Sequence, residues 1–261
     1  MTQETTRAGF VAVIGAPNAG KSTLVNTLVG QKVAIVSPKA QTTRARLMGI
    51  AIAGSVQILL VDTPGIFEPR RRLDRAMVAA AWTGAQDADL ILLVIDAAAG
   101  VNAEVERISA SLEKREHPLF VALNKIDLVK KSALLSLSAQ LTARLKPEKV
   151  FMTSAAQGDG VDDLKRGLAE AMSEGPWLYP EDEVSDATER MIAAELTREQ
   201  IVNQLHQELP YATAVEIESW EDRPDGSTVI NQQIFVERDS QKAIVIGKGG
   251  RRLKAIGAAA R

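Results

Sequence analysis

The stretch that most constrains the fold of this chain is "GAPNAGKS", residues 15–22. It fits the pattern G-x-x-x-x-G-K-[ST], and it stands between a short apolar run and a segment with helical spacing. In that position glycines let backbone N–H groups fold around an anion, and the helix N-terminus adds partial positive charge. The sequence therefore predicts a strand, a phosphate-binding loop and a helix in direct succession.

The first two thirds of the chain alternate between apolar runs and segments with helical spacing. Near-continuous apolar strands separated by helices indicate a parallel sheet with helices on both faces. We therefore predict a doubly wound α/β domain over residues 1–172, with its ligands at the carboxyl ends of the strands. The expected strands are residues 10–15, 55–62, 89–96, 118–125 and 149–154.

The last third has a different pattern and predicts a second, α+β domain. Residues 173–185 contain two prolines, a glycine and several acids, which is typical of a linker. Residues 186–261 would form the second domain, opening with a helix that Asp186 and Glu189 are expected to cap. Two apolar–polar alternating runs then flank "DRPDG", which predicts a β-hairpin. Two helix-like segments separated by the glycine-rich residues 247–250 complete the domain.

Composition excludes several classes of protein. The chain has 261 residues, a formal net charge of −2 and no cysteine, so it has neither a disulfide framework nor a thiolate metal site. It has no signal-peptide pattern and no run near the roughly 20 apolar residues that span a bilayer, so we expect a soluble cytoplasmic protein. After Asp239, however, the chain carries no acid, and this charge asymmetry indicates a nucleic-acid contact. The basic residues of this end are Lys242, Lys248, Arg251, Arg252, Lys254 and Arg261.

Two strand ends predict a phosphate and metal site. Lys21 is expected to reach the β- and γ-phosphates of a nucleotide, and the Ser22 hydroxyl to ligate Mg²⁺. Asp62 ends the strand 55–62 and can hold the same ion through water, while the Gly65 N–H is expected to meet a γ-phosphate. The stretch "DTPG", residues 62–65, also fits a simple turn, because Asp, Pro and Gly all favour turns. Beside the phosphate loop we prefer the metal-site interpretation.

The stretch "NKID", residues 124–127, predicts which base is bound. The Asp127 carboxylate can accept hydrogen bonds from the N1–H and the 2-amino group of guanine together, a donor pair that adenine lacks. Asn124 can hold the loop and the base edge, and the Lys125 stem can lie against the ring. The stretch "TSA", residues 153–155, ends the next strand and can supply a backbone N–H to guanine O6. The sequence therefore predicts GTP and GDP as ligands.

The predicted nucleotide site draws on four strand ends. Its expected contact residues are Gly15, Ala16, Pro17, Asn18, Ala19, Gly20, Lys21, Ser22, Thr23, Asp62, Thr63, Pro64, Gly65, Ile66, Asn124, Lys125, Ile126, Asp127, Ser154 and Ala155. The expected metal ligands are Ser22, Asp62 and Thr43, the last from the segment 38–47, which is expected to order around a γ-phosphate. For that segment Thr42 and a solvated Thr-Thr turn stay open as alternatives.

These motifs, together with "QTTR" at 41–44, resemble the small GTPases of the translation-factor-related class. With "VIGKGG" at 245–250 the chain closely resembles the bacterial Era family, over 9–172 as the GTPase domain and about 186–261 as the RNA-binding part. The resemblance implies a KH domain whose G-x-x-G loop clamps single-stranded nucleic acid; a complete one continues beyond residue 261, so we expect it to be incomplete here. The expected RNA-binding residues are Ile246, Gly247, Lys248, Gly249, Gly250, Arg251 and Lys254, with Val245 adding apolar surface for bases.

The resemblance also implies partners and a location. It implies binding to small-subunit ribosomal RNA near its 3′ end, a role in assembling the small ribosomal subunit, and occasional peripheral association with the inner face of the cell membrane. We expect a monomer.

Ile66 bears on whether the nucleotide is hydrolysed, because a polar side chain at this place could orient the attacking water. A GTP-hydrolysing RNA-binding switch and a nucleotide-gated RNA-binding scaffold with negligible hydrolysis are both open at this point; "NKID" disfavours a P-loop kinase. The resemblance is to GTPases with an apolar residue here, many of which use K⁺ held partly by an asparagine at the position of Asn18. The expected catalytic residues are Asn18, Lys21, Thr43 and Gly65, with slow intrinsic turnover.

Overall fold

The chain folds into two units. The computed structural model describes residues 5–37, 39, 47–62, 88–113, 115–206 and 209–261. By their contacts, residues Met1–Ala34 group with Thr43–Asp186, and residues Ile35–Thr42 group with Ala187–Arg261. The N-terminal unit holds the predicted nucleotide motifs, and the C-terminal unit holds the glycine-rich loop at 247–250.

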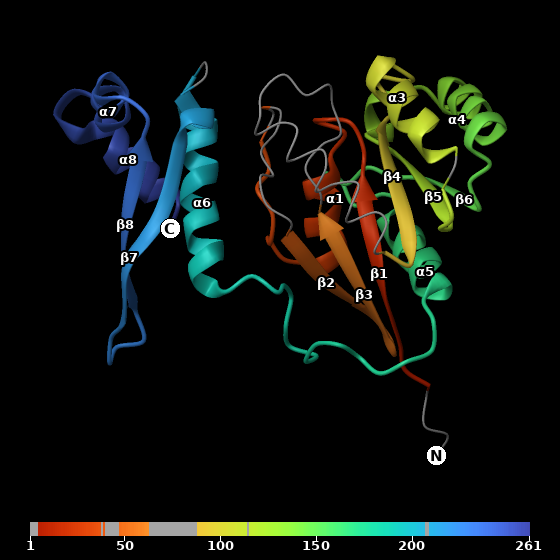
Figure 1. The fold of residues 1–261 in the computed structure, drawn as a ribbon, viewed down its shortest axis with the longest axis horizontal. Coiled ribbons are helices and arrows are strands. Elements are labelled where there is room, and N and C mark those ends of the chain that lie inside the picture. The colour runs from red at the N-terminus through yellow and green to blue at the C-terminus, as the bar shows by residue number, and fades with distance from the viewer. Residues whose placement is uncertain (1–4, 38, 40–46, 63–87, 114, 207–208) are drawn as a thin grey trace. The chain divides into compact units, whose positions relative to one another are not determined.

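The N-terminal unit is built on a six-stranded sheet with the order β2-β3-β1-β4-β5-β6 (Figure 1). Four neighbouring strand pairs are parallel, and β2 pairs antiparallel with β3. The doubly wound, mostly parallel sheet predicted from the sequence is therefore confirmed. The strands are β1 (Arg7–Ile14), β2 (Leu47–Ala53), β3 (Val56–Asp62), β4 (Leu90–Asp96), β5 (Leu119–Asn124) and β6 (Lys149–Met152).

Strand β2 was not among the expected strands. Its residues are mostly buried, and its first residue, Leu47, pairs with Asp62 at the end of β3. The turn at Gly54 and Ser55 reverses the chain between β2 and β3, and Gly54 adopts a φ of 60° there. The run "LMGIAIA" followed by a glycine is the sequence signal that predicts this strand.

Helices cover both faces of the sheet (Figure 1). On one face α1 (Lys21–Val29) and α5 (Val161–Ala171) bury residues such as Leu24 and Leu164 against it. On the other face α3 (Ala103–Leu112) and α4 (Lys131–Leu145) do the same with residues such as Ile108 and Leu141. Because both faces are covered, the open surface for a ligand lies at the strand ends.

The segment predicted as a linker lies along the edge strand β2. The N–H of Ile50 donates to the Val184 carbonyl at 2.9 Å, and the Ser185 hydroxyl donates to the Met48 carbonyl at 2.7 Å. Asp186 accepts a hydrogen bond from the Met48 N–H at 3.2 Å. These bonds satisfy the backbone of an edge strand that would otherwise be exposed.

The expected cap of the following helix was wrong. That helix, α6 (Glu189–Gln204), begins after Thr188, whose hydroxyl accepts a hydrogen bond from the Met191 N–H at 3.3 Å. Thr188 has the extended backbone of an N-cap residue, whereas Asp186 lies two residues too early and serves β2 instead.

The C-terminal unit has the predicted α+β pattern. The strands β7 (Thr213–Asp222) and β8 (Thr228–Val236) form the expected antiparallel hairpin. Its core joins the hairpin to α6, α7 (Asp239–Ile246) and α8 (Arg251–Ala259) through Ile201, Leu205, Val245 and Ile256. Short 3₁₀ turns, η2 (Leu209–Ala212) and η3 (Lys248–Gly250), connect the elements.

The expectation that Val245 offers surface to RNA bases was wrong. Its side chain is 4% exposed and belongs to the core, whereas Ile246 is 37% exposed. Neighbouring residues of a helix point about 100° apart, so only one of the two can face the core.

No helix within the described ranges is both long and apolar enough to cross a membrane.

Candidate functional site

The phosphate loop, residues 15–20, connects β1 to α1 in the predicted way. Gly20 adopts a φ of 92°, and a Cβ on it would lie 2.2 Å from Nδ2 of Asn124. Only glycine therefore lets the loop approach the end of β5 this closely. Asn18, at the exposed crest of the loop, adopts a left-handed φ of 61°, which asparagine tolerates better than most residues.

Lys21 is buried at the start of α1. Its ammonium group donates hydrogen bonds to the carbonyls of Gly15 at 3.2 Å and Ala16 at 3.0 Å. Burial lowers the pKa of Lys21 to about 8, and the carboxylates of Asp62 and Glu104 oppose part of that shift. A buried cation with a lowered pKa favours an anionic ligand, because a phosphate beside it would restore its charge.

Ser22 and Asp62 bring oxygen ligands together at the ends of α1 and β3. The Ser22 hydroxyl donates to the Asp62 carboxylate at 2.8 Å, and Asp62 is fully buried. A hydroxyl and a carboxylate at this distance are the hard oxygen donors that Mg²⁺ prefers, so the residues present fit the predicted metal. Lys21 stands near the same carboxylate, which places the expected metal ligands beside the phosphate loop.

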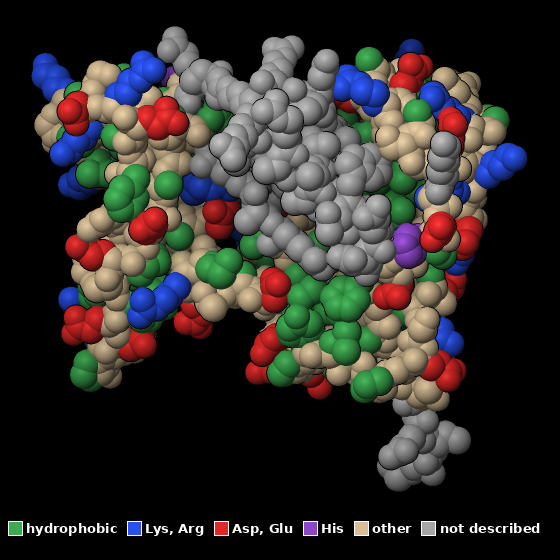
Figure 2. Space-filling view, viewed as in Figure 1, with side chains coloured by type: hydrophobic (Ala, Val, Ile, Leu, Met, Phe, Trp, Pro, Cys, Tyr) green, Lys and Arg blue, Asp and Glu red, His purple; other side chains and the backbone are tan. Residues whose placement is uncertain are grey.

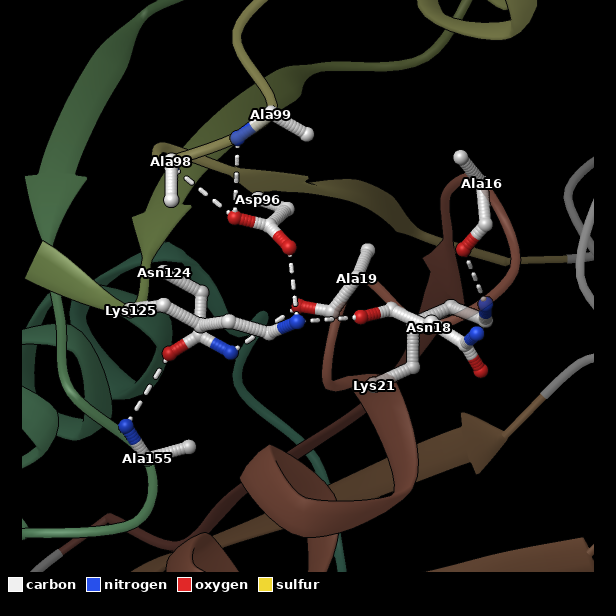
Figure 3. Close-up of polar contacts among 10 residues, drawn as sticks. All are labelled: Ala16, Asn18, Ala19, Lys21, Asp96, Ala98, Ala99, Asn124, Lys125 and Ala155. Carbon is white, nitrogen blue, oxygen red and sulfur yellow. Dashed lines mark hydrogen bonds and ion pairs between the residues drawn. The ribbon is translucent and has the colours of Figure 1, made fainter. Parts of the chain in front are cut away.

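Asn124 connects three loops at the end of β5 (Figure 3). Its side chain is buried, and its Nδ2 group donates to the Ala19 carbonyl at 3.0 Å. Its Oδ1 atom accepts hydrogen bonds from the Ala155 N–H at 3.0 Å and from the Thr153 hydroxyl at 3.3 Å. The Ala155 N–H, a candidate donor for guanine O6, thus binds Asn124 in this structure, and its role toward the base stays a prediction.

Asp127 lies in the turn η1 (Ile126–Leu128), directly after β5. Its side chain is exposed, and its Oδ1 atom accepts a hydrogen bond from the Ser154 hydroxyl at 2.6 Å. Ser154 is fully buried in the loop after β6, so it holds the carboxylate in one orientation. An oriented, exposed carboxylate suits the donor pair of guanine.

Lys125 reaches from the base loop to the phosphate loop (Figure 3). Its ammonium group donates to the Asn18 carbonyl at 2.7 Å and forms an ion pair of 2.6 Å with Asp96. Asp96, the last residue of β4, is a residue of this site that the sequence analysis missed. It ends an apolar strand run just as Asp62 does, and that signal could have found it.

The other predicted contacts are partly described. Ala16 and Pro17 lie in the phosphate loop, Thr23 in the first turn of α1, and Ile126 at the start of η1, where its N–H donates to the Thr153 carbonyl at 3.2 Å. The predictions for Thr42, Thr43, Thr63, Pro64, Gly65 and Ile66 lie outside the described residues.

The G-x-x-G loop in the C-terminal unit has the geometry of a close backbone approach. Gly247 has a φ of 71°, and a Cβ on it would lie 2.8 Å from the Arg252 Cβ. Gly249 and Gly250 also have positive φ, with no heavy atom within 4 Å of a Cβ built on either. The loop is therefore tight on the side of α8 and open on the other.

Basic side chains surround this loop. Lys248, Arg251 and Lys254 are all exposed, and Figure 2 shows Lys and Arg side chains gathered over α7 and α8. An open glycine loop flanked by exposed cations suits the phosphates of a nucleic-acid backbone.

Val36 and Lys39 pack within the C-terminal unit. The Val36 N–H donates to the buried Glu199 carboxylate at 3.0 Å. The Lys39 ammonium donates to the carbonyls of Val202 and Leu205, at the carboxyl end of α6. A cation at the end of a helix satisfies carbonyls that lack helical partners.

Comparison with known proteins identifies the family. A model of the 50S ribosome-binding GTPases matches residues 10–125, and a KH-domain model matches residues 208–261. The GTPase Era of Afipia carboxidovorans is 60% identical over 256 residues, covering 98% of this chain and 83% of that protein. The chain belongs to the Era family of GTPases. The GTPase Era of Erythrobacter litoralis is 56% identical over 265 residues, and the match covers 100% of this chain and 87% of that protein.

Solved Era structures match the fold. A crystal structure of Era in complex with MgGDPNP and nucleotides 1506–1542 of 16S ribosomal RNA has a TM-score of 0.91 at 38% identity, covering 98% of this chain and 87% of that one. A structure of an Aquifex aeolicus Era variant bound to GDP·AlF₄⁻ has a TM-score of 0.92 at 38% identity, covering 98% and 88%. This Era-family protein is thus a GTPase with a KH domain, using GTP, GDP and Mg²⁺, and the scaffold without hydrolysis is set aside.

Proposed function

We propose that this Era-family GTPase is a nucleotide-controlled switch that binds small-subunit ribosomal RNA near its 3′ end during assembly of the small ribosomal subunit. The observation that carries the proposal is the G-x-x-G loop, open on one side and flanked by exposed basic side chains. The related Era structure in complex with a 16S RNA fragment supports the choice of RNA.

The geometry of the strand ends supports a set of nucleotide contacts. The phosphate loop and Lys21 bind the phosphates, and Asp127, oriented by Ser154, binds the base edge. Asn124 fixes the distance between these two halves, because it bonds to the phosphate loop and to the loop after β6. Specificity for guanine then rests on one carboxylate whose acceptors an adenine would leave unpaired.

Hydrolysis depends on charge stabilisation and positioning. Lys21 and the N–H groups of the phosphate loop stabilise charge on the phosphates. Ser22 and Asp62, with Thr43, would hold Mg²⁺, which neutralises charge on the phosphate oxygens when it is bound. Asn18 stands at the exposed crest of the loop, and we assign it the role of holding K⁺ as an added positive charge. The Gly65 N–H is assigned to the γ-phosphate.

The segment around residue 40 is the element that couples the nucleotide to the RNA-binding unit in this proposal. Its described residues Val36 and Lys39 bond to α6 through Glu199 and the end of the helix. Thr43, the expected Mg²⁺ ligand, follows Lys39 by four residues. A change in the position of Thr43 would therefore act on a segment anchored to α6.

The RNA site is tested by titrating a single-stranded RNA with the sequence of the 3′ end of 16S RNA. The variant with Lys248→Ala and Arg251→Ala should bind RNA more weakly. The plot of log affinity against log salt concentration should become less steep by about 1.4, since each phosphate contact contributes roughly 0.7 to the slope. Arg223→Ala, an exposed arginine in the β7–β8 turn of the same unit, is the matched control. An unchanged slope in the double variant, or an equal loss in the control, would overturn the assignment.

We further propose a cytoplasmic monomer that contacts the inner face of the membrane peripherally. The family resemblance supports this assignment. Sedimentation equilibrium and flotation with anionic phospholipid vesicles test the two parts. A dimer at micromolar concentration contradicts the first, and absence of the protein from the floated vesicles contradicts the second.

A further inference from the structure

Asp96 stands between the two halves of the nucleotide site. It ends β4, the strand that lies between β1, which leads into the phosphate loop, and β5, which leads into the base loop. In the sheet register Asp96 lies opposite Asn124. Its carboxylate contacts Lys125 of the base loop, which in turn contacts the phosphate loop, although no motif of the nucleotide site contains Asp96.

The Asp96 carboxylate is held in a fixed orientation. Its Oδ1 atom accepts hydrogen bonds from the N–H groups of Ala98 at 2.9 Å and Ala99 at 3.2 Å, which build the turn after β4. The Gly100 N–H closes the same turn on the Asp96 carbonyl at 3.0 Å. With Oδ1 engaged in the turn, Oδ2 is directed at the Lys125 ammonium at 2.6 Å. Figure 3 shows this arrangement.

Lys125 carries the connection onward to the phosphate loop. The same ammonium group donates to the Asn18 carbonyl at 2.7 Å. Lys125 and Asn18 both have left-handed backbones, with φ of 62° and 61°. Non-glycine residues keep such backbones only where neighbouring contacts hold them. The chain of contacts from Asp96 through Lys125 to Asn18 joins these two strained positions.

We propose that Asp96 is a positioning residue for nucleotide binding: it holds the Lys125 ammonium on the Asn18 carbonyl and so keeps the base loop and the phosphate loop at a fixed separation. A bound guanine nucleotide must contact both loops at once. Weakening the connection from Asp96 through Lys125 to Asn18 therefore speeds dissociation of GDP and GTP alike. The inference rests on the assignment of Lys125 to the nucleotide site.

The expected rise in the dissociation rate depends on how exposed the Lys125–Asp96 ion pair is. The side chains of Lys125 and Asp96 are 31% and 22% exposed, so water screens the pair in part. Hydrogen bonds to charged groups contribute more than neutral ones, and removing one partner leaves the other without its counter-charge. We expect the dissociation rate of GDP to rise about five- to tenfold when the Asp96 charge is removed.

The experiment measures the dissociation rate of fluorescent GDP from the full chain by stopped flow. Asp96→Asn keeps an oxygen for the turn but loses the charge, and Asp96→Ser keeps a turn acceptor that is too short to reach Lys125. Asp89→Asn is the matched control, because Asp89 lies at the other end of β4 and its carboxylate accepts from the Phe10 N–H at 2.7 Å. Both Asp96 variants should release GDP faster, and the control should match the wild type.

A double-mutant cycle with Lys125→Met separates positioning from structure. If Asp96 acts through Lys125, Asp96→Asn adds less than about twofold to the dissociation rate in the Lys125→Met background. An equal effect of Asp96→Asn in both backgrounds would show that Asp96 acts only through its turn, and wild-type rates in both Asp96 variants would also overturn the proposal. If Lys125→Met itself leaves the rate unchanged, the assignment of Lys125 to the nucleotide site fails instead.

Discussion

Raising the pH above 8 should weaken nucleotide binding through Lys21. Burial lowers the pKa of this lysine to about 8 in the folded protein, well below its ordinary value of 10.5. Only the protonated form attracts phosphates, and a phosphate beside it would keep it protonated. Nucleotide binding therefore takes up a proton when the pH is above about 8.

The magnitude follows from the fraction of protonated lysine. With a pKa of about 8, that fraction falls from about 90% at pH 7 to about 10% at pH 9. The Kd for GDP should accordingly rise about tenfold between pH 7 and pH 9, and most of the rise should lie above pH 8. The folding stability of the nucleotide-free protein changes in the other direction. Between about pH 8 and pH 10.5 the unfolded state binds more protons than the folded state, so the contribution of Lys21 to stability becomes more favourable as the pH rises through that window.

Isothermal titration calorimetry with GDP at five pH values tests this reasoning. Guanosine, which lacks phosphates, is the control ligand, and its Kd should change little over the same range. Buffers with different ionisation enthalpies should report uptake of close to one proton at pH 9. A Kd for GDP that stays flat to pH 9, or an equal change for guanosine, would refute the role of Lys21.

Three other substitutions test the site. Asp127→Asn should weaken GTP binding about 10- to 100-fold and shift preference toward xanthosine triphosphate, measured by competition; unchanged preference contradicts the base assignment. The wild-type protein should hydrolyse GTP faster in K⁺ than in Na⁺, and Asn18→Ala should remove this difference. Equal wild-type rates in the two salts would remove the basis for a K⁺ role. Gly20→Ala should destabilise the protein by more than Gly30→Ala in urea unfolding, because both have positive φ but only Gly20 would clash with Asn124; equal losses would contradict the close approach.

Much of the N-terminal unit could be predicted from the sequence, because its strands are buried on both faces and read as continuous apolar runs. The phosphate loop and the base loop follow strands directly, so their motifs could be placed at the carboxyl edge of the sheet. Strand β2 also has a readable apolar run, but its antiparallel pairing at the edge of the sheet does not follow from the alternation of strands and helices.

Contacts between distant residues could not be predicted. The ion pair of Asp96 with Lys125 depends on the order of β4 and β5 in the sheet, which no local pattern specifies. Lys39 likewise meets the end of α6, which lies more than 160 residues later in the chain. Such contacts appear only when the register of the whole fold is known, and the contact of Lys125 with Asn18 joins two of the separate motifs.

The cap of α6 and the surface around the G-x-x-G loop also could not be predicted from neighbouring residues alone. The prediction took Asp186 as the cap because Glu189 follows it at the right spacing, whereas in the structure Thr188 caps α6 and Asp186 accepts from the Met48 N–H. Val245 and Ile246 are both apolar, and only the packing against Ile201 and Ile256 shows that Val245 belongs to the core.

The affinity for RNA in two nucleotide states tests the central claim most directly. Fluorescence anisotropy would measure binding of the 16S 3′-end fragment to the full chain with Mg²⁺ and either a non-hydrolysable GTP analogue or GDP. The switch predicts tighter RNA binding with the GTP analogue, and, by reciprocity, RNA must tighten binding of the analogue relative to GDP by the same factor. Equal RNA affinities in the two states would contradict a nucleotide-controlled switch.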